Sequence, residues 1–422
     1  MSSPQNTTTF FSKIGNLLGP KPQKDDTMTQ IAPSTSPSAM TGGIASPSQS
    51  QSINIDTIFA TALTRGASDI HIEPGEGSLK IRMRVDGSFV EYATLGDGEK
   101  SSLIARIKIL SSLKIDEQRL PQDGKASYHD PVSGKDVDLR VSIIPTIYGE
   151  KVVIRILKKE SELMDLRSIG VLPMNMIKIK KHLEDQFGLI LIVGPTGSGK
   201  STTLYSMLSN FDPEEKNIST LEDPVEYRIK GANHSQINPQ IGFNFADGLR
   251  SLLRQDPDII MVGEIRDSDT AHLAVEASIT GHLVFSTIHA NSTINTLQRL
   301  INLGIDPLLI ISSLQLVVYQ RLARKLCKHC KISYTPDEGI KKKILTRIGK
   351  YVTDPENLVF YRAQEGGCER CNHKGHKGRI GLFEILEMTE GIEKLILARA
   401  SKTQLEIQAI GDGMITIKDD AL

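Results

Sequence analysis

A glycine-rich segment that ends in lysine and serine carries the most specific chemistry of this sequence. Residues 194–201 read GPTGSGKS and fit G-x-x-x-x-G-K-[ST], the P-loop pattern. Glycines let the backbone fold into a nest whose N–H groups point at phosphate oxygens, and a helix starting there adds its positive end. Lys200 is expected to reach the β- and γ-phosphates, and Ser201 to ligate Mg²⁺. The segment predicts a nucleoside triphosphate site made by Gly194, Thr196, Gly197, Ser198, Gly199, Lys200, Ser201 and Thr202.

Acidic residues follow two further apolar segments. Glu222 comes after the run at 217–221, where it can hold Mg²⁺ through water or polarise the attacking water. Glu264 comes after the run at 258–262, which is the Walker B arrangement, and is the best candidate to orient or deprotonate water. Two alternatives stay open: Glu222 can belong to a solvated acidic turn, and Glu264 can serve as a salt-bridge partner of Arg266.

Histidines stand at both ends of a fourth apolar segment. His282 begins the run HLVFSTIH, and His289 ends it. A strand that carries polar side chains at its end can sense the γ-phosphate and relay its loss, so both histidines are expected to act as sensors. A histidine that is simply buried with its hydrogen bonds satisfied is the alternative.

The cysteines form two CxxC pairs, which together contain all four cysteines of the chain. Tetrahedral Zn²⁺ takes four thiolates, and a CxxC turn presents two of them at a suitable spacing. A disulfide pair is the less favoured alternative, because the cytosol keeps thiols reduced. Residues 331–367, between the pairs, are expected to form an insertion with its own helix. The sequence thus predicts a structural zinc site formed by Cys327, Cys330, Cys368 and Cys371.

Apolar segments alternate with helical patterns through residues 173–422, and this alternation must position the residues above. Strands that alternate with helices imply a parallel, doubly wound sheet that binds its ligand at the carboxyl ends of the strands. The α/β prediction therefore places the P-loop, both acids and the end of the histidine segment at one edge. The predicted strands cover residues 189–193, 217–221, 258–262 and 282–287.

Ahead of this part, residues 53–157 are expected to form a compact α+β domain. Alternating apolar residues predict strands at 79–85, 137–143 and 151–157, and helical spacing runs over 101–115. A charged linker is expected at 158–172.

Residues 1–52 are predicted to be a disordered tail, because Ser, Thr, Pro and Gln dominate residues 20–52. A short amphipathic helix is expected at residues 10–18, and so short a helix needs a partner or a membrane to dock against. A featureless tail is the alternative.

Overall charge excludes a strong general attraction to nucleic acid, since 50 basic residues balance 50 acidic ones. The sequence shows neither a signal peptide nor an apolar run long enough for a transmembrane helix, so a cytoplasmic protein is expected. Residues 321–350 hold ten Lys and Arg against two acids. This stretch can be a solvated face, or a patch for acidic partner loops or anionic lipid.

The ordered motifs resemble those of the secretion-ATPase superfamily of type II secretion and type IV pilus assembly. In the second part they are GPTGSGKSTTLY, LEDPVEY, GLRSLLRQDPDIIMVGEIRD and TGHLVFSTIHAN, which resemble the Walker A, Asp box, Walker B and His box of that family. In the first part they are ASDIHIEP, RVDG, LPQDG and GEK. The resemblance runs from about residue 53 to residue 418.

The resemblance implies a PAS-like domain at 53–157 and a RecA-like ATPase domain at 173–422 that includes a zinc-binding element at 327–371. It also implies a ring-shaped homohexamer with ATP between domains. Arg140 and Arg155 match family arginines that approach the nucleotide, a role that suits a guanidinium near the γ-phosphate. Arginines on a solvent-exposed strand face are the alternative.

The expected function is that of a cytoplasmic, Mg²⁺-dependent ATPase that powers pilus or pseudopilus assembly at the inner membrane. Its implied partners are a membrane platform protein and a cytoplasmic recruitment protein, with peripheral membrane contact through the N-terminal helix or residues 321–350. A RecA-like motor for nucleic acid or conjugative DNA transfer is the alternative. Neutral charge and the lack of an aromatic-plus-basic pattern speak against it, so no nucleic-acid partner is expected. A scaffold that binds ATP without hydrolysing it is a third option.

Overall fold

The computed structural model describes residues 54–422 apart from 132–133, 135, 159–164, 352–353 and 355–356. The tail predicted at residues 1–52, with its helix at 10–18, lies outside the described residues. No helix in the described ranges is long and apolar enough to cross a membrane.

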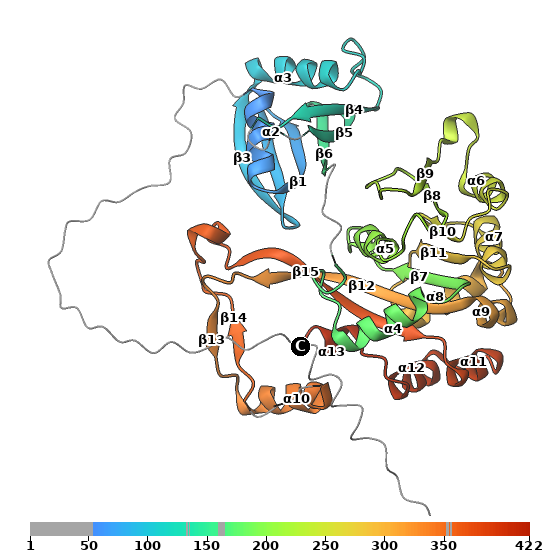
Figure 1. The fold of residues 1–422 in the computed structure, drawn as a ribbon. Coiled ribbons are helices and arrows are strands. Elements are labelled where there is room, and N and C mark those ends of the chain that lie inside the picture. Colours follow the sequence, from blue (N-terminus) through green and yellow to red (C-terminus); the bar gives the residue numbers. More distant parts are fainter. Residues whose placement is uncertain (1–53, 132–133, 135, 159–164, 352–353, 355–356) are drawn as a thin grey trace, which may run out of the picture. The chain divides into compact units, whose positions relative to one another are not determined.

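An antiparallel six-stranded sheet forms the first folded part, in the order β3-β2-β1-β6-β5-β4. Apolar residues alternate along most of its strands, so one face carries the buried side chains and the other the polar ones. Two helices cover the buried face (Figure 1). Its elements are α2 (Ile55–Thr64), β1 (Ala67–Gly75), β2 (Ser78–Val85), β3 (Ser88–Gly96), α3 (Asp97–Leu110), β4 (Gln122–His129), β5 (Asp136–Thr146) and β6 (Gly149–Lys158).

Helix α3 begins four residues before the predicted helix at 101–115 and ends five residues before it. Asp97 and Glu99 lie in its first turn, where acidic side chains interact favourably with the helix dipole. The helix ends at Leu110 because Ser112 adopts a positive φ of 56°, which no helix residue can have.

A seven-stranded sheet forms the second part, in the order β15-β12-β7-β11-β10-β8-β9. All neighbours pair in parallel except β12 and β15. Its strands and helices are α4 (Pro173–Leu183), β7 (Gly188–Val193), α5 (Lys200–Leu208), β8 (Ile218–Glu222), β9 (Asn233–Gln236), η2 (Pro239–Ile241), α6 (Phe245–Leu252), β10 (Ile259–Val262), α7 (Ser268–Ile279), β11 (Leu283–Ile288), α8 (Thr293–Asn302), α9 (Pro307–Ser313), β12 (Leu314–Leu326), β15 (His376–Glu387), α11 (Glu390–Leu397), α12 (Lys402–Gly411) and α13 (Ile417–Asp420).

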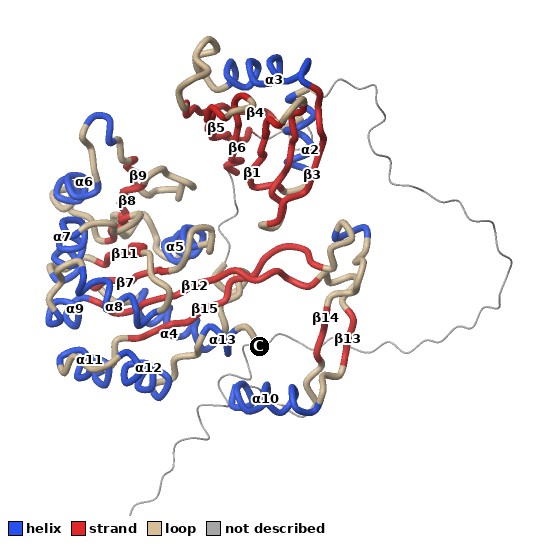
Figure 2. The backbone as a smooth tube through the Cα atoms, turned by 180° about the vertical axis from the view of Figure 1, so that it is seen from behind, coloured by secondary structure: helices blue, strands red, loops and turns tan. Residues whose placement is uncertain are grey.

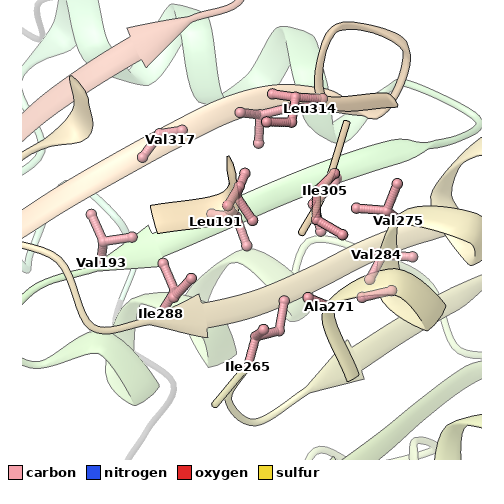
Figure 3. Packing of buried hydrophobic residues seen from close by; sticks show 14 of the residues in the cluster. Leu191, Val193, Ile265, Ala271, Val275, Val284, Ile288, Ile305, Leu314 and Val317 are labelled. Atoms are coloured by element: carbon pink, nitrogen blue, oxygen red, sulfur yellow. The ribbon is translucent and has the colours of Figure 1, made fainter. Parts of the chain in front are cut away.

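Strand β7, in the interior of the sheet, is buried on both faces, because its alternate residues belong to two separate hydrophobic clusters. Leu191 and Val193 point into the cluster of Figure 3, where Val284 of β11, Val317 of β12 and Val275 of α7 surround them. Ile190 and Ile192 face the other cluster, which includes Leu204 of α5. Each such buried aliphatic side chain stabilises the fold by about 1.5–3 kcal/mol. Helices therefore cover both sides of the sheet, as in a doubly wound fold.

Between β12 and β15 lies an excursion that contains the cysteines. Figure 2 shows the two long strands side by side, and they pair from Leu316 with Glu387 to Leu326 with His376. The excursion holds a helix, as expected, together with a two-stranded ribbon. Its elements are β13 (Ile332–Tyr334), α10 (Glu338–Ile348), η3 (Gly349–Tyr351), β14 (Phe360–Arg362) and η4 (Glu369–Cys371).

Candidate nucleotide site and metal centre

The P-loop follows β7 at the carboxyl edge of the sheet, and its glycines adopt conformations that other residues avoid. Gly194, Gly197 and Gly199 have φ angles of 150°, 75° and 90°. A Cβ atom on Gly194 would lie 2.5 Å from the carbonyl oxygen of Gln320 on β12. The neighbouring strand thus packs directly on the loop and leaves no room for a side chain there.

Helix α5 begins at Lys200, with Gly199 as its N-cap residue and no side-chain cap among the described residues. The first N–H groups of a helix have no intrahelical partner, so they suit an anion. Ser201 and Thr202, in this first turn, are half-buried. Ser198 is buried, and its hydroxyl has no hydrogen-bond partner among the described residues. The loop and the first turn of α5 therefore present groups of the kind that can bind a phosphate.

The Lys200 ammonium group lies over the loop itself. Its Nζ donates to the carbonyl oxygens of Gly194 at 3.1 Å and Pro195 at 3.3 Å. Burial lowers the pKa of Lys200, while the negative charges of Glu264 and Glu226 act against that shift. A phosphate placed in the loop would therefore meet a partly desolvated cation.

Glu264 lies two residues beyond β10, at the same edge of the sheet. Its carboxylate accepts a close ion pair from the guanidinium of Arg266, and its second oxygen lies 3.8 Å from His289 Nε2. The hydrogen bond that Arg266 donates to Glu264 raises the pKa of Arg266. Only 17% of the Glu264 side chain is exposed. Glu264 thus forms the salt bridge with Arg266 that was the alternative interpretation. It also lies near His289, one of the two predicted sensors.

His282, the other predicted sensor, lies at the wrong end of its strand, and this prediction is wrong. It precedes β11, whose first residue, Leu283, pairs with Gly188 at the start of β7. With about 3.3 Å per residue, β11 separates His282 from His289 by about 20 Å. The His282 ring instead meets the carbonyl oxygen of Ala277 at 2.9 Å.

Glu222 ends β8 inside a buried network rather than on a solvated turn. Its carboxylate accepts close hydrogen bonds from the Tyr205 hydroxyl and, at 2.6 Å, from the Thr220 hydroxyl. His234 Nδ1 lies 2.9 Å from the same carboxylate. The backbone N–H of Ile229 donates to His234 Nε2, so the ring proton resides on Nδ1 and points at Glu222. Glu222 therefore holds α5, which carries Tyr205, against β8 and β9.

Sequence reasoning missed Tyr205, His234 and Gln320. Gln320 is 2% exposed in the middle of β12, and its Oε1 accepts from the Thr203 hydroxyl at 2.7 Å. An amide within the apolar run LQLVVYQ was the available signal. Tyr205 and His234 offered none, because their roles depend on which strands become neighbours.

Arg140 and Arg155 lie on the polar face of the first sheet, directly opposite each other on β5 and β6. Both are exposed, and Arg155 Nε donates to Asp69 Oδ1 at 3.0 Å. Two like charges at directly opposite positions repel. The arrangement can offer two guanidinium groups to one anion.

The four cysteines come together in one cluster. Three of the sulfur pairs are separated by 3.8 Å, and ligand atoms from all four residues lie within 4.8 Å of one another. A tetrahedral zinc ion with Zn–S bonds of about 2.3 Å requires sulfur atoms about 3.8 Å apart. The backbone N–H groups of Cys368 and Gly375 donate to Cys371 Sγ and lower the pKa of Cys371 to about 6, whereas burial raises that of Cys330. The donor set fits zinc.

Sequence comparison places the chain among bacterial secretion proteins. The family described as "Type II/IV secretion system protein" matches residues 47–421. The chain is 43% identical over 368 residues to the type IV pilus assembly ATPase PilB of Thermus thermophilus, and 44% identical over 368 residues to the type II secretion system ATPase E of Vibrio cholerae. Each alignment covers 87% of this chain, but 40% of the first relative and 71% of the second. The PilB of Myxococcus xanthus is 42% identical, with 64% of its length covered.

Comparison with solved structures shows the fold. The Legionella pneumophila ATPase DotB superposes with a TM-score of 0.64 at 23% identity, over 89% of this chain and 93% of DotB. The pilus retraction motor PilT with bound ADP gives a TM-score of 0.53 at 24% identity, over 87% of this chain and 96% of PilT. The chain thus shares a mixed α/β fold with these ATPases.

Proposed function

We propose that this chain, which belongs to the type II/IV secretion system protein family, hydrolyses ATP to power the assembly of a pilus or pseudopilus. The relatives that it resembles over 87% of its length are named as pilus assembly and type II secretion ATPases. The observation that carries the proposal is the glycine cradle around Lys200, with Glu264 at the same edge of one parallel sheet.

The nucleotide is held by the P-loop and by the first turn of α5. On nucleotide binding, the Lys200 ammonium group would exchange its hydrogen bonds to the loop carbonyls for contacts with the β- and γ-phosphates. Ser201 would ligate Mg²⁺. Mg²⁺ held there would supply positive charge against the negative charge that develops on the phosphates. The residues that bind the nucleotide are Gly194, Thr196, Gly197, Ser198, Gly199, Lys200, Ser201 and Thr202.

Glu264 orients or deprotonates the attacking water in this proposal. Arg266 pairs with one carboxylate oxygen, so the second oxygen is the one that would accept from the water when the γ-phosphate arrives. His289 lies close enough to the second oxygen to respond to that change. Glu222 supports the metal–water network from behind, because its buried hydrogen bonds fix the helix that carries Lys200 and Ser201.

The first sheet and its helices are proposed to be a PAS-like domain that precedes a RecA-like ATPase domain. Arg140 and Arg155 lie on the polar face of this first sheet and would approach the γ-phosphate from there. Their guanidinium groups would stabilise the negative charge of the transition state. After hydrolysis the two arginines would lose their contact with the γ-phosphate, and this loss would allow the two domains to move relative to each other.

Zinc is proposed as the structural metal of Cys327, Cys330, Cys368 and Cys371. It would clamp the start of the excursion after β12 to its end before β15. The remaining assignments rest on the family alone: a homohexamer in the cytoplasm, peripheral to the inner membrane, with a platform protein and a recruitment protein as partners. The predicted helix at 10–18 or the basic residues of 321–350 would supply membrane contact.

Steady-state phosphate release with Mg-ATP tests the proposal. Lys200→Ala should abolish turnover, since the phosphates lose their cation, whereas Lys216→Ala should leave it unchanged. Lys216 is the control because it pairs with Asp258 at the amino edge of the same sheet. Equal turnover in wild type and Lys200→Ala would refute the site. Turnover that rises with single-stranded DNA and falls with salt would favour the nucleic-acid motor instead.

A further inference from the structure

A row of charged side chains crosses the polar face of the first sheet. The strand register places Lys125 opposite Arg140, Arg140 opposite Arg155, Arg155 opposite Asp69, and Asp69 opposite Arg84. The row therefore contains four cations on β4, β5, β6 and β2, with one acid among them on β1. Neighbouring cations at these spacings repel one another, whereas an acid between them attracts its neighbours. The position of Asp69 in the row therefore bears on how its neighbouring cations are held.

A β-bulge brings Asp69 onto the polar face. Ala67 pairs with Val85, yet Asp69 already pairs with Arg84, so Ser68 is an extra residue in β1. Without the bulge, alternation would turn Asp69 to the same side as the buried Ala67. The hydroxyl of Ser68 also donates to Asp69 Oδ2 at 2.8 Å. The β-bulge at Ser68 thus places the Asp69 carboxylate on the polar face, in line with the cations.

The contacts of Asp69 fix the orientation of Arg155. Its Oδ1 accepts from Arg155 Nε at 3.0 Å, and its Oδ2 lies 3.7 Å from Arg84 Nε. The Asp69 side chain is 10% exposed, whereas that of Arg155 is 63% exposed. A guanidinium held through Nε keeps its two terminal nitrogens available, and that edge matches two oxygens of a phosphate.

We propose that Asp69 is a positioning residue that holds the Arg155 guanidinium with its terminal edge ready for the γ-phosphate. This inference rests on the proposed ATPase function and on the role given there to Arg155. A preorganised guanidinium loses less side-chain freedom when the transition-state charge appears, and small errors of placement reduce the rate strongly.

Glu73 provides a matched control on the same strand and the same face. Its carboxylate pairs with Arg82 at 2.6 Å and with Lys151 at 3.0 Å. Its removal therefore breaks two ion pairs of the first sheet and leaves the contact between Asp69 and Arg155 intact.

The test measures kcat, ATP affinity and melting temperature in the full chain. Asp69→Ala should lower kcat by up to about a hundredfold with ATP affinity nearly unchanged, and the double variant with Arg155→Ala should be no slower than Arg155→Ala alone. Asp69→Asn should recover part of the rate, because its amide oxygen can still accept from Nε. Glu73→Ala should keep kcat within about twofold of wild type.

The outcomes separate this inference from the proposed function. A low kcat in Arg155→Ala together with normal rates in both Asp69 variants would overturn the positioning role and leave the function standing. Normal turnover in Arg155→Ala would refute the proposed contact of Arg155 with the γ-phosphate. It would also refute the positioning role of Asp69, which depends on that contact. Equal losses of kcat and melting temperature in Asp69→Ala and Glu73→Ala would show a purely structural acid, which also overturns the inference.

Discussion

A buried hydrogen-bond network around Glu222 connects the helix that follows the P-loop to its neighbouring strands. Glu222 is buried, and three donors surround its carboxylate. Burial and the charge of Glu222 raise the pKa of Tyr205, so its phenol stays protonated and donates at any physiological pH. The network therefore needs Tyr205 as a permanent donor.

Tyr205→Phe should destabilise the fold by about 1–3 kcal/mol, since it leaves a buried carboxylate one hydrogen bond short. Chemical denaturation measures the free energy of unfolding. Tyr148→Phe, on an exposed turn, is the control and should change little. Equal stability of the two variants would mean that Glu222 does not depend on the phenol.

Asp420 predicts a pH dependence of stability. Burial raises the pKa of this carboxyl from 3.8 to about 6, although the backbone N–H of Phe383 favours the charged form. A raised pKa means that the fold prefers the protonated group, so its contribution is complete below pH 3.8 and is lost as the pH rises through about 6.

Asp420→Asn cannot ionise and should escape that loss. Its melting temperature relative to wild type should be higher at about pH 8 than at about pH 5. Thermal unfolding at the two values measures the difference. A difference that does not change with pH would contradict the assigned pKa.

At the scale of elements, the P-loop is shaped as much by β12 as by its own sequence. Gly194 and Gly197 both have positive φ, but only Gly194 would bring a Cβ atom into contact with Gln320, since nothing lies within 4 Å of the position on Gly197. Space, rather than backbone conformation alone, distinguishes the two glycines.

Gly194→Ala should therefore weaken ATP binding more than tenfold, because the loop has to move away from β12. Gly197→Ala should carry only the cost of a left-handed conformation, about 1–2 kcal/mol. Titration of a fluorescent ATP analogue measures both affinities. Equal effects would show that β12 does not shape the loop.

The cysteine cluster joins the two ends of the excursion between β12 and β15. Metal analysis of the purified protein should find about one zinc per chain. Cys368→Ser should lose the metal and lower the melting temperature, because metal binding and local folding are linked. Glu369→Gln, at an exposed neighbouring position, should retain both. A metal-free protein with wild-type stability would contradict the assignment.

Elements with strong apolar runs could be predicted from sequence, and others could not. Strands β7 and β10 are buried on both faces, and their sequences are continuous apolar runs. Strands β4 and β9 were missed because QDGKASYH and NHSQ are polar. His282 was misplaced although its sequence position is informative: a residue that begins a parallel strand lies at the edge opposite the carboxyl ends, where the ligand binds.

At the scale of the whole molecule, one sheet carries the P-loop and Glu264, and the other carries the row of four cations with Asp69 among them. The proposed function assigns the nucleotide to the sheet with the P-loop and an approach of Arg140 and Arg155 to the other. Because Glu264 is the acid proposed to act on the attacking water, hydrolysis should depend most on this residue.

Phosphate release and ATP binding measured together for Glu264→Gln are the sharpest test of whether this acid acts on the attacking water. Glutamine keeps the size of the side chain but cannot accept the proton of water, so binding should stay near that of wild type while turnover falls by about a hundredfold or more. Undiminished phosphate release in Glu264→Gln would contradict the role of Glu264 in ATP hydrolysis.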